Sequence, residues 1–230
     1  MLRKLKIVID DIIRTVITNI SGVTGRKIRY WYWSKKFKKC GKNVIIDEGV
    51  IIQNPQWISI GDNVWIDKYS VLMAGPVDFG GNSVVKKKKN NSFKWNEGEL
   101  IIGNEVHIGM FNIIQAHAGV YIGDKVTTSA GVKIYSLSNY PFDENNPALI
   151  TYANYLVKEG TVAYILSPIV IEEGVWIGLN SIVLGGCIGK NSFIASNSIV
   201  LKDIPENSYA AGNPAQRIKP RFKMGLNDEK

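Results

Sequence analysis

Two histidines are the residues of this chain best suited to move a proton near neutral pH, and the sequence contains only these two. An imidazole titrates close to pH 7, so it can take a proton from an attacking hydroxyl and return it to a leaving group. His107 lies in the run VHIG and His117 in QAHAG. Two cysteines, Cys40 and Cys187, are too few for a disulfide framework or a structural zinc site, so we expect reduced thiols.

Composition restricts the class of protein. The 230 residues are 45% hydrophobic and 21% charged, and no apolar run approaches the ~18 residues that a membrane span needs, so we expect no integral membrane protein. The first twenty residues begin like a signal peptide, but Asp10, Asp11 and Arg14 interrupt them and no cleavage site follows, which predicts a cytoplasmic protein. The net charge of +8 suits a phosphate-bearing partner, whether a nucleotide, a nucleic acid or an anionic membrane face.

The chain has an internal period of six residues. Aliphatic residues recur at this spacing, with a break in the middle and a slip of one residue near the end, and four residues later comes a small or β-branched side chain. The first series is Ile60, Ile66, Leu72, Ile102, Ile108, Ile122, Thr128, Ile134, Ile171, Ile177, Val183, Ile188, Ile194 and Val200. The second series is Val64, Ser70, Val106, Val126, Val132, Val175, Ser181, Cys187, Ser192 and Ser198.

This period predicts a prism of stacked three-strand coils. If each unit is a short strand plus a turn, both series point inward, because alternate strand residues share a face. Three units close a triangular coil, and successive coils pair their strands in parallel. A β-sandwich is the alternative, but its strands would recur every 8 to 12 residues. We expect the positive φ of the corner turns at Gly61, Asn63, Gly103, Asn104, Gly123, Gly189 and Asn191.

On these repeats and on the closing segment KDIPENSYAAGNPAQRI, the chain resembles the hexapeptide-repeat acyltransferases, and the sugar O-acetyltransferases in particular. The resemblance covers roughly residues 40–222. It implies an all-β fold, a left-handed parallel β-helix, with acetyl-CoA as acyl donor and no metal. It also implies a homotrimer that O-acetylates a sugar or lipid-linked glycan in O-antigen-type or capsule-type polysaccharide biosynthesis, with no nucleic-acid partner.

An N-terminal segment, residues 1–39, precedes the repeat. It carries apolar residues at helical spacing and then the basic aromatic stretch RKIRYWYWSKKFKK. It either caps the first coil or touches the inner membrane face. We favour capping, because most amphipathic helices bury their apolar stripe within their own protein. The stripe consists of Ile9, Ile12, Ile13, Val16, Ile17 and Ile20.

Two loops are predicted to interrupt the domain of residues 40–222, and a tail, 223–230, follows it. The first loop, 76–99, contains KKKKNN, which we interpret as a solvated loop tip, with a grip on an anionic acceptor as the alternative. The second, 140–167, falls where the resembling enzymes extend an arm over a neighbouring subunit's site.

The residue expected to act as base is missing from its usual place. In galactoside and maltose acetyltransferases the catalytic histidine follows the repeat before the arm, where this chain has Asn139, and an amide cannot accept that proton. The inward spacing stretches to eight residues before Ile122, so residues 115–119 bulge at a corner, and residues 137–139 lie one coil above, about 4.8 Å away. We therefore predict that His117 is the base and shares a pocket with Asn139. The alternative is a corner histidine without a role.

The resemblance also suggests acceptor contacts. Asn112, Asn139 and Tyr140 are the predicted substrate-binding residues, although a corner asparagine such as Asn112 is often only a turn former. His107 falls on an outward strand position comparable with Trp65 and Trp176, so we expect it at an interface or on the surface rather than in catalysis.

The pantetheine arm of acetyl-CoA is expected in a groove between subunits. One basic family position falls on Gln216, which removes a phosphate-binding charge, and Arg217 or Arg221 could replace it because guanidinium groups suit phosphate. For each basic residue a solvated surface charge is the simpler alternative. The predicted cofactor contacts are Leu179, Ser196, Leu201, Lys202, Arg217 and Lys219.

The same residues bear on three other functions. An N-acetyltransferase of amino or nucleotide sugars would also place a histidine at a coil corner, and a non-catalytic β-helix scaffold is favoured by the loss at Asn139. A γ-type carbonic anhydrase needs three histidine ligands for zinc, which two histidines do not readily provide. Trimerisation would cover the outward apolar residues Trp65, Val71, Ile113, Trp176, Ile182 and Phe193.

Overall fold

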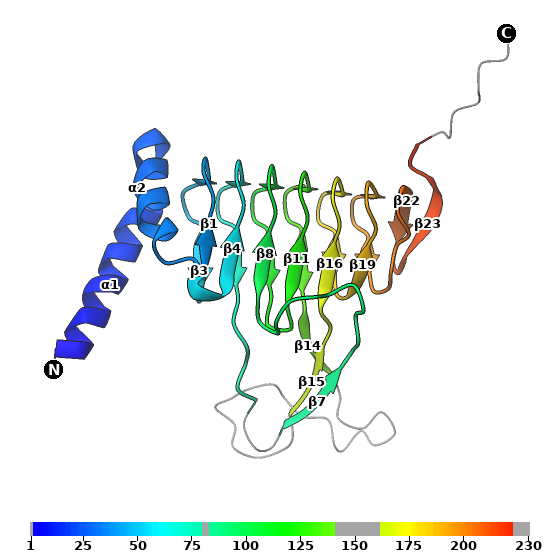
Figure 1. Ribbon diagram of the computed structural model, residues 1–230, viewed down its shortest axis with the longest axis horizontal. Coiled ribbons are helices and arrows are strands. Elements are labelled where there is room, and N and C mark those ends of the chain that lie inside the picture. Colours follow the sequence, from blue (N-terminus) through cyan, green and yellow to red (C-terminus); the bar gives the residue numbers. More distant parts are fainter. Residues whose placement is uncertain (1, 80–82, 141–161, 223–230) are drawn as a thin grey trace, which may run out of the picture.

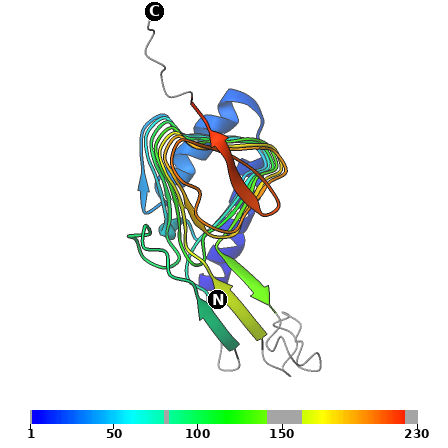
Figure 2. The same cartoon turned by 90° about the vertical axis from the view of Figure 1, so that its right-hand side faces the viewer.

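The computed structural model describes residues 2–79, 83–140 and 162–222, and within these ranges the chain forms a prism of six stacked coils (Figure 1). Two helices lie at one end of the stack and a β-hairpin lies at the other. Viewed along its axis, the prism has a triangular outline with an arm of strands projecting from one corner (Figure 2). The fold is the predicted left-handed parallel β-helix.

Each side of the prism is one sheet of parallel strands, which we name face A, face B and face C. Face A contains β1 (Lys39–Cys40), β4 (Ile58–Ile60), β8 (Leu100–Ile102), β11 (Val120–Ile122), β16 (Ile169–Ile171) and β19 (Gly186–Ile188). Face B contains β2 (Ile45–Ile46), β5 (Trp65–Ile66), β9 (His107–Ile108), β12 (Thr127–Thr128), β17 (Trp176–Ile177), β20 (Phe193–Ile194) and β22 (Ser208–Gly212), followed by the antiparallel strand β23 (Ala215–Pro220). Face C contains β3 (Ile51–Gln53), β6 (Val71–Met73), β10 (Ile113–Gln115), β13 (Lys133–Tyr135), β18 (Ile182–Val183) and β21 (Ile199–Val200). A 3-10 turn, η1 (Pro55–Trp57), lies in the first corner between faces C and A.

The predicted inward columns form the core. Every residue of the aliphatic series is buried, including Thr128, and so is every residue of the second series except Cys187. Cys187 was predicted to point inward, but its side chain is half-buried on the outside of β19. The reason is the slip near the end of the repeat, because five residues instead of six separate Val183 from Ile188 and the residue before Ile188 then points outward. Its partial burial raises the pKa of the Cys187 thiol.

The corner glycines are needed for space, not for positive φ. Asn63 and Asn191 have φ values of 57°, as predicted, but Gly61, Gly103, Gly123, Gly189 and Asn104 are not among the positive-φ residues. A Cβ atom at Gly61 would lie 2.6 Å from the Asn104 side-chain oxygen and 2.7 Å from the backbone of the next coil. The turns reach positive φ one or two positions later, for example at Glu105 and Lys125. The repeat therefore selects glycine where successive coils approach most closely.

The N-terminal segment divides into two helices with different roles. α2 (Gly22–Ser34) caps the first coil with buried Tyr32 and Trp33. α1 (Leu2–Asn19) leads away from the prism (Figure 1), and only Ile17 of the predicted apolar stripe is buried, with Ile20 half-buried. The prediction that the stripe packs within the domain is therefore wrong for most of α1. Among the described residues, the helices are too short or too polar to cross a bilayer.

Arg29 fastens both helices to the prism. Its guanidinium is 1% exposed and donates to the carbonyl oxygens of Ile17 at 3.0 Å, Ile20 at 2.6 Å and Ile46 at 2.7 Å. Two of these acceptors are at the end of α1, where helical carbonyls lack intrahelical partners. Burial lowers the pKa of Arg29 despite the nearby carboxylates of Asp47 and Glu48.

Replacing Arg29 with methionine is expected to lower the free energy of unfolding by about 3 kcal/mol or more, because buried carbonyl oxygens lose their donors. Chemical denaturation with circular dichroism measures this change. Lys27→Met removes an exposed positive charge from the same helix and should change stability by less than about 0.5 kcal/mol. Equal stability of the two variants would contradict the fastening role of Arg29.

The two predicted insertions meet in one arm at the corner between faces C and A. β14 (Leu137–Tyr140) pairs antiparallel with β15 (Val162–Leu166), and β15 pairs in parallel with β7 (Ser83–Lys87). The lysine run was predicted to be a loop tip, but Lys86 and Lys87 belong to β7 because their backbone completes this sheet. Their side chains are exposed, as expected. Residues 141–161 and the tail 223–230 are outside the described residues.

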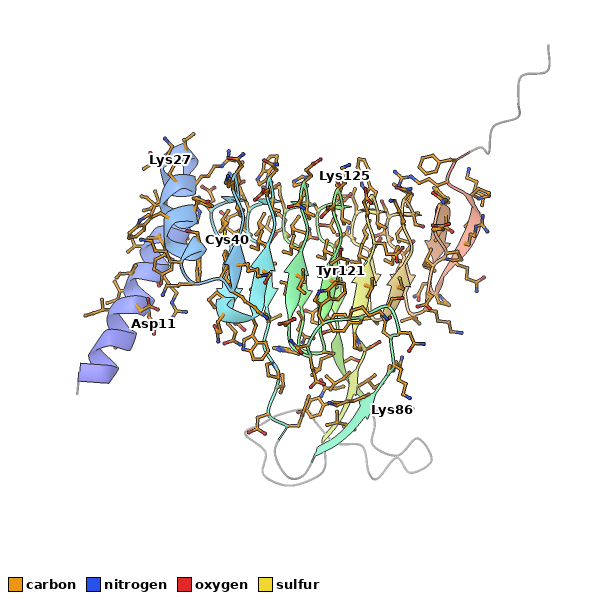
Figure 3. The ribbon with its side chains drawn as sticks, viewed as in Figure 1. Asp11, Lys27, Cys40, Lys86, Tyr121 and Lys125 are labelled. Carbon is orange, nitrogen blue, oxygen red and sulfur yellow. The ribbon has the colours of Figure 1, made fainter. Side chains whose placement is uncertain are left out.

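The first insertion returns to the prism across face A. The side chain of Asn90 donates to the carbonyl oxygens of Pro168 and Gly186, and Trp95 stacks on Tyr121 with 4.0 Å between ring centroids. Figure 3 shows Tyr121 on face A next to this returning segment. These contacts fix the segment between β7 and β8 against three successive coils.

Candidate active site

His117 lies at the corner where face C passes to face A, and its imidazole is half-buried. Its Nδ1 atom is 2.8 Å from the carbonyl oxygen of Gly75, one coil below. A carbonyl oxygen can only accept, so Nδ1 carries the proton in the neutral ring. Nε2 is then the unprotonated nitrogen and can accept a proton from a substrate. This is the tautomer and orientation that a general base requires.

The bulge that carries His117 is held rigidly from the coil above. The hydroxyl of Ser136 accepts from the Ala118 N–H and donates to the Gln115 carbonyl oxygen, both at 2.9 Å. The Leu137 N–H donates to the Gln115 side chain at 3.1 Å. From below, the Gly75 N–H donates to the Gly98 carbonyl oxygen at 2.7 Å. The predicted bulge is therefore present, and both neighbouring coils fix it.

Ser136, Gln115 and Gly75 were missed by the sequence reasoning. Gly75 has φ of +92°, which favours glycine at the point where the first insertion begins. Ser136 is fully buried between the bulge and the arm. One sequence pattern could have indicated Ser136. It is a serine directly after a repeat unit that leads out of the prism, and it lies one coil above the irregular corner. Nothing in the sequence shows which carbonyl orients His117.

Two other predicted acceptor residues, Asn139 and Tyr140, lie on β14 of the arm. Leu137 lies above the bulge, as predicted, but β14 then leaves the prism to pair with β15. Asn139 is exposed on the arm opposite Tyr164, and no hydrogen bond among the described residues joins it to His117. Tyr140 pairs through its backbone with Ala163, and its side chain is outside the described part of the chain. A pocket shared by His117 and Asn139 stays a prediction.

Asn112 is buried in the corner between faces B and C. It is 0% exposed, and its side-chain NH2 group lies 2.7 to 3.2 Å from the carbonyl oxygens of Gly109, Met110 and Ser129. These bonds close the corner between faces B and C from inside and support the turn-former alternative, while the predicted substrate contact of Asn112 stays a prediction.

Replacing Asn112 with alanine is expected to lower the free energy of unfolding by about 1 to 3 kcal/mol, because carbonyl oxygens in a buried corner lose a donor. Thermal unfolding measures the loss, and steady-state kinetics on the folded variant should give an unchanged KM for the acceptor. A raised KM at unchanged stability would support the substrate-binding assignment.

His107 faces outward, as predicted. It pairs with Trp65 and Thr127 on face B, and its ring stacks on Trp65 with 4.8 Å between centroids. Its Nε2 atom is 3.9 Å from a carboxylate oxygen of Asp67. His107 therefore lies on face B, across the prism from the corner between faces C and A that carries His117. Its predicted place in a subunit interface stays untested.

The predicted cofactor residues lie at three places in one chain, and all are exposed. Leu179 and Ser196 are neighbours at the corner between faces B and C, where the Asn197 N–H donates to the Leu179 carbonyl oxygen at 2.8 Å. Leu201 and Lys202 are on the opposite edge of face C, after β21. Arg217 and Lys219 are in the terminal hairpin, with the Lys219 ammonium 5.2 Å from the Tyr209 ring centroid. One chain alone does not bring the three groups together.

Arg221 holds the terminal hairpin against the prism through one nitrogen of its guanidinium. Its guanidinium donates to the carbonyl oxygens of Gly174, Asn191 and Ser192 at 2.8 to 3.3 Å, which fastens the terminal hairpin to the corner between faces A and B. Arg217 is exposed and remains a candidate for the phosphate-binding charge missing at Gln216.

Relatives with known names cover most of this prism. No family model matches the sequence. A dTDP-4-amino-4,6-dideoxy-D-glucose acyltransferase from Escherichia coli is 30% identical over 194 residues, which are 83% of this chain and 85% of that protein. A galactoside O-acetyltransferase from Lactococcus lactis is 35% identical over 130 residues, 55% of this chain and 56% of that protein. For three further relatives, the match to this chain covers only 26% to 55% of the relative's own length.

Solved structures show the same architecture. A variant of AntD, an N-acyltransferase from Bacillus cereus in complex with dTDP and coenzyme A, superposes with a TM-score of 0.66 at 21% identity and covers 85% of this chain and 90% of that one. A hexapeptide-repeat acetyltransferase from Vibrio cholerae complexed with acetyl-CoA gives a TM-score of 0.54 at 22% identity, with 90% and 83% covered. At these identities the likeness establishes the hexapeptide-repeat β-helix.

Proposed function

The chain belongs to the hexapeptide-repeat acyltransferases, and on that premise we propose that it transfers an acetyl group from acetyl-CoA to a sugar hydroxyl, with His117 as general base. The observation that carries this is the bond from Nδ1 of His117 to the Gly75 carbonyl oxygen, which leaves Nε2 free to accept. Nε2 takes the hydroxyl proton while the oxygen bonds to the thioester carbonyl carbon. The intermediate then collapses, the carbon–sulfur bond breaks, and the proton passes to the CoA sulfur.

A sugar acceptor is supported by two relatives. One is named for a nucleotide-linked amino sugar and the other for galactosides. We place the product in cell-surface polysaccharide biosynthesis, on the cytoplasmic side where acetyl-CoA is available. The two free cysteines fit that reducing compartment.

An amine is the second candidate acceptor. It is favoured because the relative that covers 83% of the chain acylates a 4-amino sugar by name. A neutral amine is already nucleophilic and needs less help from a base than a hydroxyl does. Asparagine at the usual base position would then cost little, and His117 would accept the proton only after attack.

A homotrimer is part of the proposal. Leu179 and Ser196 lie on one edge of face C, and Leu201 and Lys202 lie on the other. If face C of one subunit meets an edge of the next, contacts that are apart in one chain come together around one pantetheine arm. The outward apolar residues of face C give the physical reason for such packing.

The decisive experiment mixes the purified protein with acetyl-CoA and a panel of nucleotide-linked sugars with hydroxyl or amino groups, and follows release of free thiol. Treating the product with mild base separates an ester, which is cleaved, from an amide, which survives. A base-labile product supports the hydroxyl, and a base-stable one supports the amine.

Binding of the donor is measured separately. Coenzyme A at 100 times its dissociation constant should stabilise the protein by about 2.7 kcal/mol in a thermal shift assay. No thiol release with any acceptor, together with no thermal shift, would support a non-catalytic scaffold instead.

A further inference from the structure

α1 exposes its apolar face to solvent, whereas a helix that packs on its own domain buries that face. Its apolar side chains Val8, Ile9, Ile12 and Val16 are 48% to 58% exposed, and Ile13 is 42% exposed. Its polar side faces the protein instead. Such a stripe normally turns inward, because exposing it to water forfeits the hydrophobic gain.

The polar contacts of α1 fix this orientation. Asp10 accepts from the Tyr32 hydroxyl and from the Lys36 ammonium, both at 2.9 Å, and pairs with Arg14 at 3.2 Å. Arg14, Thr15 and other polar residues of α1 line a groove together with Trp33 and the first coil. Figure 3 shows Asp11 on the side of α1 nearer to the prism. The apolar stripe therefore faces away from the prism as a consequence of specific bonds.

Charge is concentrated in the same part of the chain. Residues 1–42 contain twelve basic and two acidic residues, whereas the remainder contains sixteen basic and eighteen acidic ones. The two helices and the start of the first coil thus carry a net charge of +10, and the rest of the chain carries −2. A surface that combines an apolar stripe with this charge matches the chemistry of an anionic lipid interface.

α2 adds an exposed aromatic and basic row of its own. Val23, Lys27, Trp31 and Lys35 follow one another at intervals of four residues, and all are exposed. Trp31 is 61% exposed and the Lys35 ammonium lies 3.9 Å from its ring centroid. Tryptophan beside lysine is a common pair at membrane interfaces, where the ring sits at the level of the headgroups.

We propose that α1 lies in the plane of an anionic bilayer surface, with its apolar stripe among the upper acyl chains and the basic residues of the N-terminal segment against the lipid phosphates. Figure 1 shows that α1 projects beyond the end of the coil stack, so the stripe can reach a flat surface without steric conflict with the prism. This docking is independent of the transfer reaction proposed above, and its tests do not require activity.

A lipid surface explains the stripe better than a second copy of the chain does. Packing two copies through α1 would bring two segments of charge +10 together, which is repulsive. An anionic bilayer attracts the same charge, at a strength that falls with added salt. An anionic bilayer therefore both buries the apolar stripe and attracts the basic residues.

The test is flotation of the purified full chain with vesicles of neutral phosphatidylcholine alone, or of phosphatidylcholine mixed with phosphatidylglycerol. We expect the protein to float with the anionic vesicles, and high salt to weaken this. In Ile12→Glu/Val16→Glu the partition coefficient should fall at least ~100-fold, since each buried isoleucine or valine contributes roughly tenfold or more. Both substituted side chains are exposed, so the variant should fold.

The matched control is Lys88→Ala/Lys89→Ala, which lowers the net charge by the same two units at exposed sites on the first insertion. It should float like the wild type. Failure of the wild type to bind anionic vesicles, or equal binding by the Ile12→Glu/Val16→Glu variant, would overturn the proposal. Light scattering of that variant identifies the other occupant, because a lower oligomer mass without vesicle binding would assign the stripe to a second copy.

Discussion

Replacing His117 with alanine is expected to lower kcat/KM for acetyl transfer by about 10²- to 10⁴-fold, the usual contribution of a general base. The loss should be in kcat, because the imidazole acts on the proton that moves in the transition state. The hydrogen bond from Nδ1 to the Gly75 carbonyl oxygen fixes the ring with Nε2 as the accepting nitrogen. Release of free thiol from acetyl-CoA measures the effect.

The matched control is His107→Ala, because it removes the other imidazole of the chain from face B. It should leave kcat nearly unchanged if His107 has no role in proton transfer. His117→Gln, which keeps a polar side chain of similar length, should be about as inactive as the alanine variant if proton acceptance is what matters. Activity that survives both His117 substitutions would exclude His117 as the base.

The fold could be predicted from the sequence because a six-residue period leaves few arrangements of the chain. Each inward position repeats the same environment, so a column such as Ile108, Thr128 and Ile177 is visible as spacing alone. The insertions were located for the same reason, since a break in the period marks the place where the chain leaves the prism. The bulge at His117 was found from an interval of eight residues.

The candidate site was less predictable, because its geometry depends on contacts between coils that no spacing encodes. Arg221 and Asn112 are residue types that bind ligands, yet here they satisfy backbone carbonyl oxygens inside corners. Asn139 has the expected position in the sequence after the repeat unit of Ile134, but its strand pairs with β15 and so places it on the arm. α1 has the pattern of a packed helix, and only the bonds of Asp10 reveal that its polar side faces the domain.

Introducing glutamate at Ile182 is expected to convert a trimer to monomers and to lower activity at least ~100-fold. Ile182 lies outward on β18, next to the last strand of face C, and it is half-exposed in the single chain. Its register partners are Ile199 on β21 and Lys133 on β13, and beyond Lys133 the same outward column continues with Ile113, Val71 and Ile51. Transferring a carboxylate from water into an interface costs about 3 kcal/mol or more, which is roughly 100-fold in the association constant.

The control for that experiment is Val23→Glu, which adds the same charge to a side chain that is 67% exposed on α2, away from the three faces of the prism. Light scattering should give a trimer for Val23→Glu and a monomer for Ile182→Glu, while circular dichroism stays the same because both positions face outward. Loss of activity must follow loss of the trimer if the donor lies between subunits, since Leu179 and Leu201 lie on opposite edges of face C in one chain. A fully active Ile182→Glu monomer would mean that one chain holds acetyl-CoA alone, and the shared site would have to be abandoned.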